Sequence, residues 1–412
     1  MPRFINWTAG PGGSLEPYRF PPFPPLFTWD FTQQSPGALV LPTGLSFARA
    51  SSGHTVQTGD ATIVTAGITS NDIGRIGRLA TAHSYGLLIE PARTNLAQRS
   101  RAIATSPWMP GLTVATTPDA AAGPDGASSA DRSNVTSGGF SNYQPITTVS
   151  GTTYAFSTWI AARTSAQNHR VAFSETVSAY TIVSTSNAPT TWQRVSGTRA
   201  ATATTCYLVP CDGSNRTGTG GPAAMALDFF TDFAQVEAGG YPTSAIITTG
   251  STATRAAERL TIDSTRSAAS IVRGRLAIYL RFRAIAALSS LDYLSEGYLL
   301  REVGGNFNVR LYANSQQLEI NGPPGYQSIT GSSAISIAAR DLVEMYFEFG
   351  AGKSVARWRI NGVRSVATWA VRDDTFPALG SSPSGIDIMN SGGVWQMPGV
   401  LELMNTFVPG YF

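Results

Sequence analysis

The fold of this chain depends on one stretch, Gly86-Leu87-Leu88-Ile89-Glu90-Pro91-Ala92-Arg93-Thr94-Asn95-Leu96. Its apolar run predicts a short buried strand. Pro91 ends this strand because proline cannot donate to a sheet ladder, and the polar Arg93-Thr94-Asn95 then turn the chain outward. The segment on its N-terminal side has the character of an attachment region. The segments on its C-terminal side have the alternating pattern of β-sandwiches.

Composition favours β-structure along the chain. Among 412 residues, 41 are Gly and 25 are Pro, whereas charged residues amount to only 13%. This balance is typical of many short strands joined by turns, because helices would need more Glu, Lys and Leu. The length allows two or three domains, each with its own core. A net charge of +3, with no basic run interleaved with aromatics, argues against a nucleic-acid partner.

The N-terminal sequence Met1-Pro2-Arg3-Phe4-Ile5-Asn6 lacks the charged and apolar regions of a leader peptide. No apolar run reaches the roughly 18 residues needed to span a bilayer. We therefore expect synthesis in the cytoplasm, no membrane insertion, and arrival outside the cell only within a larger assembly. Cys206 and Cys211 have no further Cys or His nearby in sequence, which favours two buried thiols over a disulfide or a metal site.

Further motifs accompany the central stretch in a fixed order. They are Phe47-Ala48-Arg49-Ala50-Ser51-Ser52, Gln235-Val236-Glu237-Ala238-Gly239-Gly240-Tyr241-Pro242-Thr243-Ser244 and Thr254-Arg255-Ala256-Ala257. Together they resemble the signatures of bacteriophage fibre and head-spike proteins, in which they accompany a carbohydrate-binding-module-like jelly roll. The resemblance extends over more than half of the chain. The basic pI and the lack of a leader peptide are also similar to the head spikes of gene transfer agents.

The resemblance implies an all-β protein with four parts. They are an extended particle-docking arm (1–35), a loop-rich collar that supplies edge strands to the next domain (36–96), the jelly-roll β-sandwich (97–250) and a concanavalin A/laminin-G-like β-sandwich (251–412). The last assignment follows from strand pattern, including the hairpin signal Asn361-Gly362. The implied function is adhesion of a virion or phage-like particle, made in the bacterial cytoplasm, to host capsular or other surface polysaccharide. The implied partners are a capsid or tail/adaptor protein and further copies of the chain in a homo-oligomer.

The N-terminal arm combines prolines with large apolar side chains. Proline favours an extended conformation without its own sheet or helix, so these side chains must be buried against another surface. We expect docking to a capsid or adaptor protein, and packing on the jelly roll is the alternative. The docking residues would be Phe20, Phe23, Leu26, Phe27 and Trp29.

Two strands of the expected jelly roll carry candidate glycan-binding residues. In Met225 to Glu237, alternation places Leu227, Phe229 and Phe233 inward, and Asp228, Phe230 and Asp232 outward. Trp159 points outward from a second strand. A pyranose presents an apolar face and a rim of hydroxyls, so an exposed aromatic beside carboxylates is suited to bind it. The alternative is that Trp159 and Phe230 pack against a covering layer.

The last domain has a second candidate face. Alternation places Leu276, Ile278, Leu280 and Phe282 inward, and it directs aromatic and cationic side chains outward. The outward residues include Tyr279, Arg281 and Arg357, with Arg283, Tyr346 and Arg359 beside them. Forked arginine contacts could hold an acidic polysaccharide, and a solvated basic face is the alternative.

Catalysis has little support in the sequence. Asp228 and Asp232 would lie about 13 Å apart along an extended strand, whereas glycoside hydrolysis needs carboxylates about 5 to 10 Å apart. His54, His83 and His169 are scattered, and no Gly-x-Ser-x-Gly motif is present. We therefore expect no enzyme and no cofactor. A capsule depolymerase and a structural spacer that carries another receptor-binding protein are the alternatives. Pro124-Asp125-Gly126 with Asp131 could help bind a structural Ca²⁺, but an ordinary turn has the same sequence.

Overall fold

The computed structural model describes residues 25–33, 41, 43–51, 53–55, 67–69, 76–77, 84–176, 182–213, 225–291, 296–305, 307–312, 318–322, 329–330, 335–364, 378–380, 383–389 and 399–407. These residues form 29 strands, one α-helix (α1, Ser264–Ser270) and one 3-10 helix (η1, Leu288–Ser290). The all-β prediction is therefore confirmed. Within this part of the chain, no helix has the length and apolar character needed to cross a bilayer.

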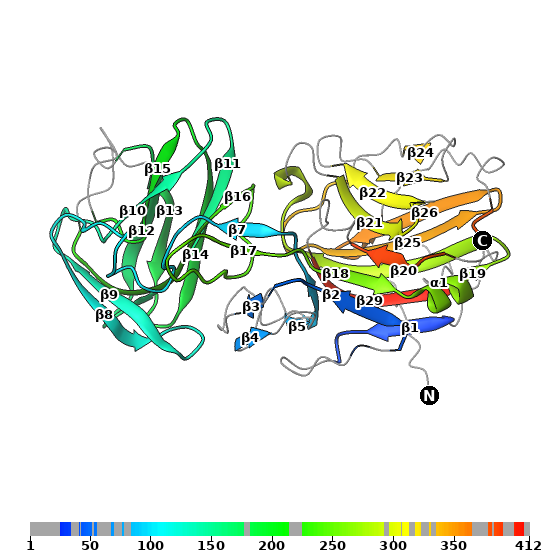
Figure 1. Cartoon of the computed structure of the whole chain (residues 1–412), viewed down its shortest axis with the longest axis horizontal. Helices are drawn as coiled ribbons and strands as arrows, with labels where there is room; N and C mark the ends of the chain where they lie inside the picture. The colour runs from blue at the N-terminus through cyan, green and yellow to red at the C-terminus, as the bar shows by residue number, and fades with distance from the viewer. Residues whose placement is uncertain are drawn as a thin grey trace, which may run out of the picture.

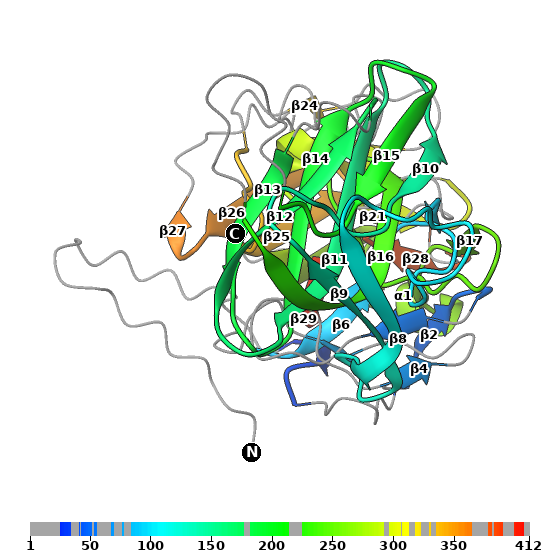
Figure 2. The ribbon, with the colours of Figure 1, turned by 90° about the vertical axis from the view of Figure 1, so that its left-hand side faces the viewer.

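The strands form two lobes that lie side by side along the long axis of the molecule (Figure 1). The chain passes between the lobes twice, through β7 (Arg93–Asn95) and β17 (Ala253–Arg255), which pair antiparallel. One lobe contains only strands that lie between β7 and β17 in sequence, and we call it the inserted sandwich. The other lobe contains strands from both sides of that insertion, and we call it the split sandwich. Viewed along the long axis, the inserted sandwich lies in front of the split sandwich (Figure 2).

The inserted sandwich has two antiparallel sheets with a core between them. The five-stranded sheet has the order β14 (Gln193–Ala200), β11 (Thr153–Ala162), β16 (Leu227–Ala238), β9 (Ser128–Val135) and β8 (Val114–Ala122). The four-stranded sheet has the order β10 (Gln144–Thr147), β15 (Thr205–Val209), β12 (Gln167–Ser174) and β13 (Ile182–Ala188). Each sheet therefore has an inner face toward the core and an outer face on its other side.

The split sandwich has a nine-stranded and a seven-stranded sheet around one large core. The first has the order β27 (Val363–Arg364), β26 (Lys353–Ile360), β25 (Leu342–Gly350), β20 (Arg275–Ala284), β29 (Gly399–Phe407), β6 (Gly86–Ile89) and β5 (Ile76–Gly77), with β1 (Phe27–Asp30) on β29 and β19 (Ile271–Val272) on β20. The second has the order β2 (Leu45–Ala48), β18 (Arg259–Ile262), β28 (Ile386–Ile388), β21 (Glu296–Glu302), β22 (Asn308–Tyr312), β23 (Leu318–Asn321) and β24 (Ile329–Thr330). A separate hairpin contains β3 (Gly53–Thr55) and β4 (Gly67–Thr69).

Alternation predicted the core-facing residues of the split sandwich correctly. The inward set on β20, which is Leu276, Ile278, Leu280 and Phe282, is fully buried in the core. The expected hairpin is also present, because β26 and β27 pair across Asn361 and Gly362. Both turn residues have positive φ, 51° and 80°, as a type I′ turn requires.

The arm prediction is wrong for its described part. Phe27, Trp29 and the strand β1 belong to the split sandwich, where β1 pairs with β29. Trp29 is 2% exposed within the main core, and Phe27 packs against that core. These side chains are therefore not available to dock on a particle. Leu26 is partly exposed and donates its N–H to Thr406, whereas Phe20 and Phe23 lie outside the described residues.

The collar prediction is also wrong about which sandwich receives the edge strands. The strands before residue 92 were expected to supply edges to the jelly roll, but β2 pairs with β18, and β5 and β6 continue from β29. They are thus edge strands of the split sandwich. That sandwich is not the contiguous unit 251–412 that strand pattern suggested, because it needs strands from both ends of the chain. Sequence could not reveal this, since a strand's pattern does not identify its partner.

A β-bulge on β16 reverses the expected direction of Phe233. On β11, Ser157 lies opposite Gln235 and Trp159 lies opposite Asp232, so β16 has one extra residue between them. Phe233 has a φ of 50°, a conformation that marks the bulge. Leu227 and Phe229 face the core as predicted, but after the bulge Ala234 and Val236 do so instead of Phe233. Phe233 thus lies on the outer face beside Trp159.

Candidate functional site

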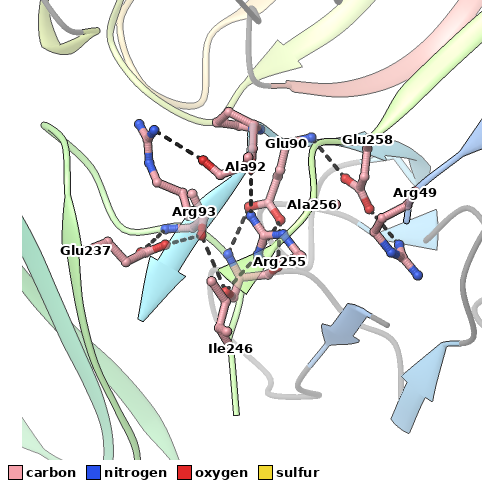
Figure 3. A network of polar contacts seen from close by, with 12 residues as sticks. Arg49, Glu90, Ala92, Arg93, Glu237, Ile246, Arg255, Ala256 and Glu258 are labelled. Atoms are coloured by element: carbon pink, nitrogen blue, oxygen red, sulfur yellow. Dashed lines mark hydrogen bonds and ion pairs between the residues drawn. The ribbon is translucent and has the colours of Figure 1, made fainter. Parts of the chain in front are cut away.

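Residues of the sequence motifs meet at the junction between the two sandwiches (Figure 3). Glu90 follows directly after β6 and is fully buried. Its carboxylate accepts hydrogen bonds from the backbone N–H of Ser244 at 2.9 Å and from the Ser244 hydroxyl at 2.6 Å. Arg255 lies 3.4 Å from the same carboxylate and donates to the Ser244 carbonyl. Glu90 therefore links the split sandwich to the segment that follows β16.

Two further side chains extend this contact. The Asn95 side chain donates to the backbone carbonyls of Ala234 and Ile246, and its side-chain oxygen accepts from the backbone N–H of Val236. Glu258 accepts from the backbone N–H of Glu90 on one oxygen and from buried Arg49 on the other, at 2.9 and 2.8 Å. The motifs that are far apart in sequence thus form one polar network. It fixes the junction and presents no surface to a ligand.

Trp159 and Asp232 are not exposed, so this part of the predicted glycan site is wrong. Trp159 is 2% exposed and packs with Phe233, Ala245, Trp192 and Ile247. The segment after β16 covers this part of the outer face, because Ile246 N–H donates to Gln235 on that face. A covering layer was the alternative considered for Trp159, and the structure shows that layer.

Asp232 is bound by an arginine of the protein and is not available to a ligand. Arg101 donates to both of its oxygens, at 3.1 and 3.0 Å, and lies 4.3 Å above the Phe233 ring. Ser129 and the backbone N–H of Phe233 also donate to Asp232. Burial nevertheless raises the pKa of Asp232 to about 6, because the loss of water outweighs these donors. This cluster holds the β8–β9 hairpin, through Asp125 on Arg101, against the bulge.

The turn that was considered as an alternative Ca²⁺ site has its carboxylates bound by other groups of the protein. Both oxygens of Asp125 accept from Arg101, at 2.9 and 2.7 Å. Asp131 instead accepts from the backbone N–H groups of Ala104 and Asp119. Among the residues that the structure describes, no group of three or more His, Cys, Asp or Glu side chains could hold a metal ion. Cys206 and Cys211 are buried free thiols.

Phe230 and Asp228 do remain at the surface. Phe230 is half-buried and lies opposite Arg132 on β9 and Ala161 on β11. Arg132 holds Asp228 with two parallel hydrogen bonds, of 2.7 and 3.0 Å, and Arg163 contacts the same carboxylate at 3.3 Å. We call Phe230, Arg132, Asp228 and Arg163 the Phe230 surface. The pKa of Asp228 lies below its ordinary value, chiefly because Arg132 donates to the ionised carboxylate.

The predicted face of the last domain is a buried network and not a solvated basic face. Tyr279 is 2% exposed and donates to Glu344 at 2.7 Å. Arg281 and Arg283 both pair with fully buried Glu402, each at 2.9 Å. Burial raises the pKa of the Tyr279 phenol, so it stays a donor. Arg357, on β26 opposite Tyr346, is half-buried and has further interactions of its own.

A pair of tyrosines on the other sheet of the inserted sandwich was missed. Tyr143 and Tyr207 are half-buried on the outer face of the four-stranded sheet, with ring centroids 5.9 Å apart in an edge-to-face arrangement. Met109, which is 45% exposed, forms a bridge to Tyr143. In β15 (Thr205–Val209), Cys206 and Leu208 face the core, so Tyr207 between them lies on the outer face. Alternation within this short strand was the signal that could have found it.

Comparisons with known proteins give little further information. No protein-family model matches the chain, and no curated protein matches it. Among solved structures, it is similar to the CBM22-1 and GH10 modules of an endo-1,4-β-D-xylanase 10B from Clostridium thermocellum, solved with xylohexaose. The match covers 38% of this chain and 30% of that chain, with 13% sequence identity and a TM-score of 0.26. At these values the match decides nothing about the fold or the ligand of this chain.

Proposed function

We propose that this protein is a non-catalytic adhesion protein of a phage or phage-like particle, which binds host cell-surface polysaccharide through the Phe230 surface. The observation that carries the proposal is a half-buried aromatic ring on a sheet face, flanked by a forked arginine–carboxylate pair. Such a ring can stack on the apolar face of a sugar. The sheet beneath holds it in place, so little conformational entropy is lost when a ligand binds.

The polar groups around Phe230 suit sugar hydroxyls. Arg132 uses two of its five N–H donors on Asp228, which leaves donors for a ligand. Arg163 is 45% exposed, so it can turn toward a bound chain. The Arg132–Asp228 pair also fixes both side chains before binding, which lowers the entropy cost of using them.

Two features support a non-catalytic role. Asp232 is fully buried and bound to Arg101, so it is not placed to act on a substrate at the surface. Asp228 is held ionised by Arg132 and Arg163, whereas an acid catalyst in glycoside hydrolysis must keep its proton. The rival depolymerase would need a carboxylate pair elsewhere.

The particle context rests on the motifs that resemble phage fibre and head-spike proteins. Phe20 and Phe23 remain candidates for docking to a capsid, tail or adaptor protein. Leu26, whose side chain is exposed, also remains a candidate, whereas Phe27 and Trp29 do not because they pack on the core of the split sandwich. Several copies at one site on a particle would add avidity to weak single contacts. The location that follows is the particle surface.

The test is binding of purified protein to host capsular polysaccharide. Phe230→Ala should weaken binding about tenfold, which corresponds to about 1.4 kcal/mol. Val149→Ala is the control, because Val149 is exposed just after β10 in the other sheet of the inserted sandwich and should leave binding unchanged. Unchanged binding by the folded Phe230→Ala variant would refute the site. New reducing ends in the polysaccharide would favour the depolymerase, and normal adsorption of particles that lack the protein would favour the spacer.

A further inference from the structure

The outer face of the seven-stranded sheet carries a straight row of polar side chains. Thr261, Asp387, Arg301, Asn308 and Asn321 lie opposite one another on consecutive strands, from β18 through β28, β21 and β22 to β23. Their neighbours in each strand, such as Ile386, Ile388 and Ile320, face the core. We call these five residues the polar row. With about 4.8 Å between strands, the row is about 19 Å long and crosses the strands at right angles.

Contacts within the sheet hold the two ends of the row in place. At one end, Asp387 accepts from Arg259 at 2.8 Å and from the Thr261 hydroxyl at 2.7 Å. At the other end, the side-chain N–H₂ group of Asn321 donates to the side-chain oxygen of Asn308 at 2.9 Å. Asn321 also donates to Glu319, at 3.1 Å. These side chains are therefore ordered before any ligand arrives.

Arg301 lies in the middle of the row and differs from the other arginines on this face. Arg259 pairs with Asp387 and Arg310 pairs with Glu319. Arg301 contacts the ring of Tyr298, with its guanidinium carbon 5.9 Å from the ring centroid. Among the residues that the structure describes, no carboxylate forms an ion pair with it. Among the described side chains, Arg301 is therefore the arginine of these three whose guanidinium has no ion pair with a carboxylate.

The row also keeps unused hydrogen-bonding groups. Within the described part of the chain, no residue accepts from the side-chain N–H₂ group of Asn308 or donates to the side-chain oxygen of Asn321. Both residues are half-buried and neither group is enclosed. One offers a donor and the other an acceptor, which is what a sugar hydroxyl needs. The half-buried rings of Tyr298 and Tyr312 flank the row and offer apolar contact area.

We propose that the polar row binds a linear polysaccharide that contains uronic acids, with one carboxylate held by Arg301. The guanidinium of arginine matches a carboxylate with two parallel hydrogen bonds, and Arg301 has no such partner among the residues that the structure describes. A row of donors and acceptors about one sugar apart fits an extended chain better than a single sugar. The proposal rests on the adhesion role, but not on the Phe230 surface, because the two sites lie in different sandwiches.

The experiment compares two polymers that differ only in charge. Polygalacturonate carries one carboxylate per sugar, and its methyl ester carries none. The full-length protein should bind polygalacturonate at least about tenfold more tightly. Arg301→Gln should remove this preference. Arg340→Gln is the control for net charge, since Arg340 is an exposed arginine of the same sandwich, and the preference should persist in that variant.

Phe230→Ala distinguishes failure of this inference from failure of the proposed function. This variant should keep its preference for polygalacturonate, because the polar row lies in the other sandwich. Equal binding of the two polymers by the unaltered protein, including no binding of either, would overturn the polar row as an acidic-glycan site. A preference that survives Arg301→Gln would overturn it as well. Neither result would affect binding of neutral capsule through Phe230.

Discussion

Replacing Glu90 by Ala should destabilise the whole protein, because this side chain connects the two sandwiches. The change removes three contacts at once: the backbone N–H of Ser244, its hydroxyl, and the guanidinium of Arg255. Arg255 has only 1% of its side chain exposed, so it would be left as a buried cation beside unpaired donors. Breaking one side of a buried charge pair costs about 3 to 5 kcal/mol. Glu90→Gln keeps an acceptor and should cost less, about 1.5 to 3 kcal/mol.

Urea unfolding followed by far-ultraviolet circular dichroism measures these costs as changes in the free energy of unfolding. The control is Glu175→Gln, which breaks the ion pair with Arg199 near the surface of the inserted sandwich. Partly exposed pairs contribute about 0 to 1 kcal/mol, so this variant should unfold nearly as the unaltered protein does. Hydrogen exchange should also accelerate in β7 and β17 when Glu90 is replaced. A cost below about 1 kcal/mol for Glu90→Ala would refute the view that this network holds the junction.

Three other predictions follow from buried side chains. Trp29→Ala should cost about 3 to 5 kcal/mol in unfolding experiments, because it empties a core site, and a near-neutral result would restore Trp29 as a docking residue. Burial lowers the pKa of His169 to about 3, below its unfolded value of about 6.5. Thermal melts should therefore show stability falling as pH drops from about 6.5, and His169→Gln should flatten that slope. Burial raises the pKa of Asp232 to about 6, so its contribution to stability should fall as pH rises from about 4 to about 6. A melting series of Asp232→Asn over that range should lack this decrease, and an unchanged slope would contradict the assignment.

Periodicity predicted which side chains face a core when a strand was regular. The alternating residues of β20 all pointed as expected, and the Asn361-Gly362 turn formed the expected hairpin. The same reasoning failed at Phe233, because one extra residue in β16 changes the parity of everything after it. A period-two pattern contains no sign of such a bulge when aromatic and small apolar residues stand on both sides of it.

Exposure was harder to predict than direction. Trp159 does point away from the core of the inserted sandwich, but the segment around Ala245 covers it. Tyr279 lies on the outer face of its sheet and is buried all the same. Alternation identifies the face of a sheet on which a residue lies, and a long-range contact decides whether that face meets solvent. Such contacts depend on segments far apart in sequence, so they could not be predicted from the strand alone.

The sequence motifs contribute buried side chains to the junction between the two sandwiches. Arg49, Glu90, Asn95 and Arg255 are buried at the junction, where the chain leaves the split sandwich and returns to it. An insertion of this kind needs two crossing strands side by side and a network of hydrogen bonds and ion pairs among the polar groups buried between the lobes. The Phe230 surface and the polar row contain no residue of these motifs. A protein that shares the motifs would therefore share the way in which one sandwich is inserted into another, while its ligand would depend on sheet faces that the motifs do not describe.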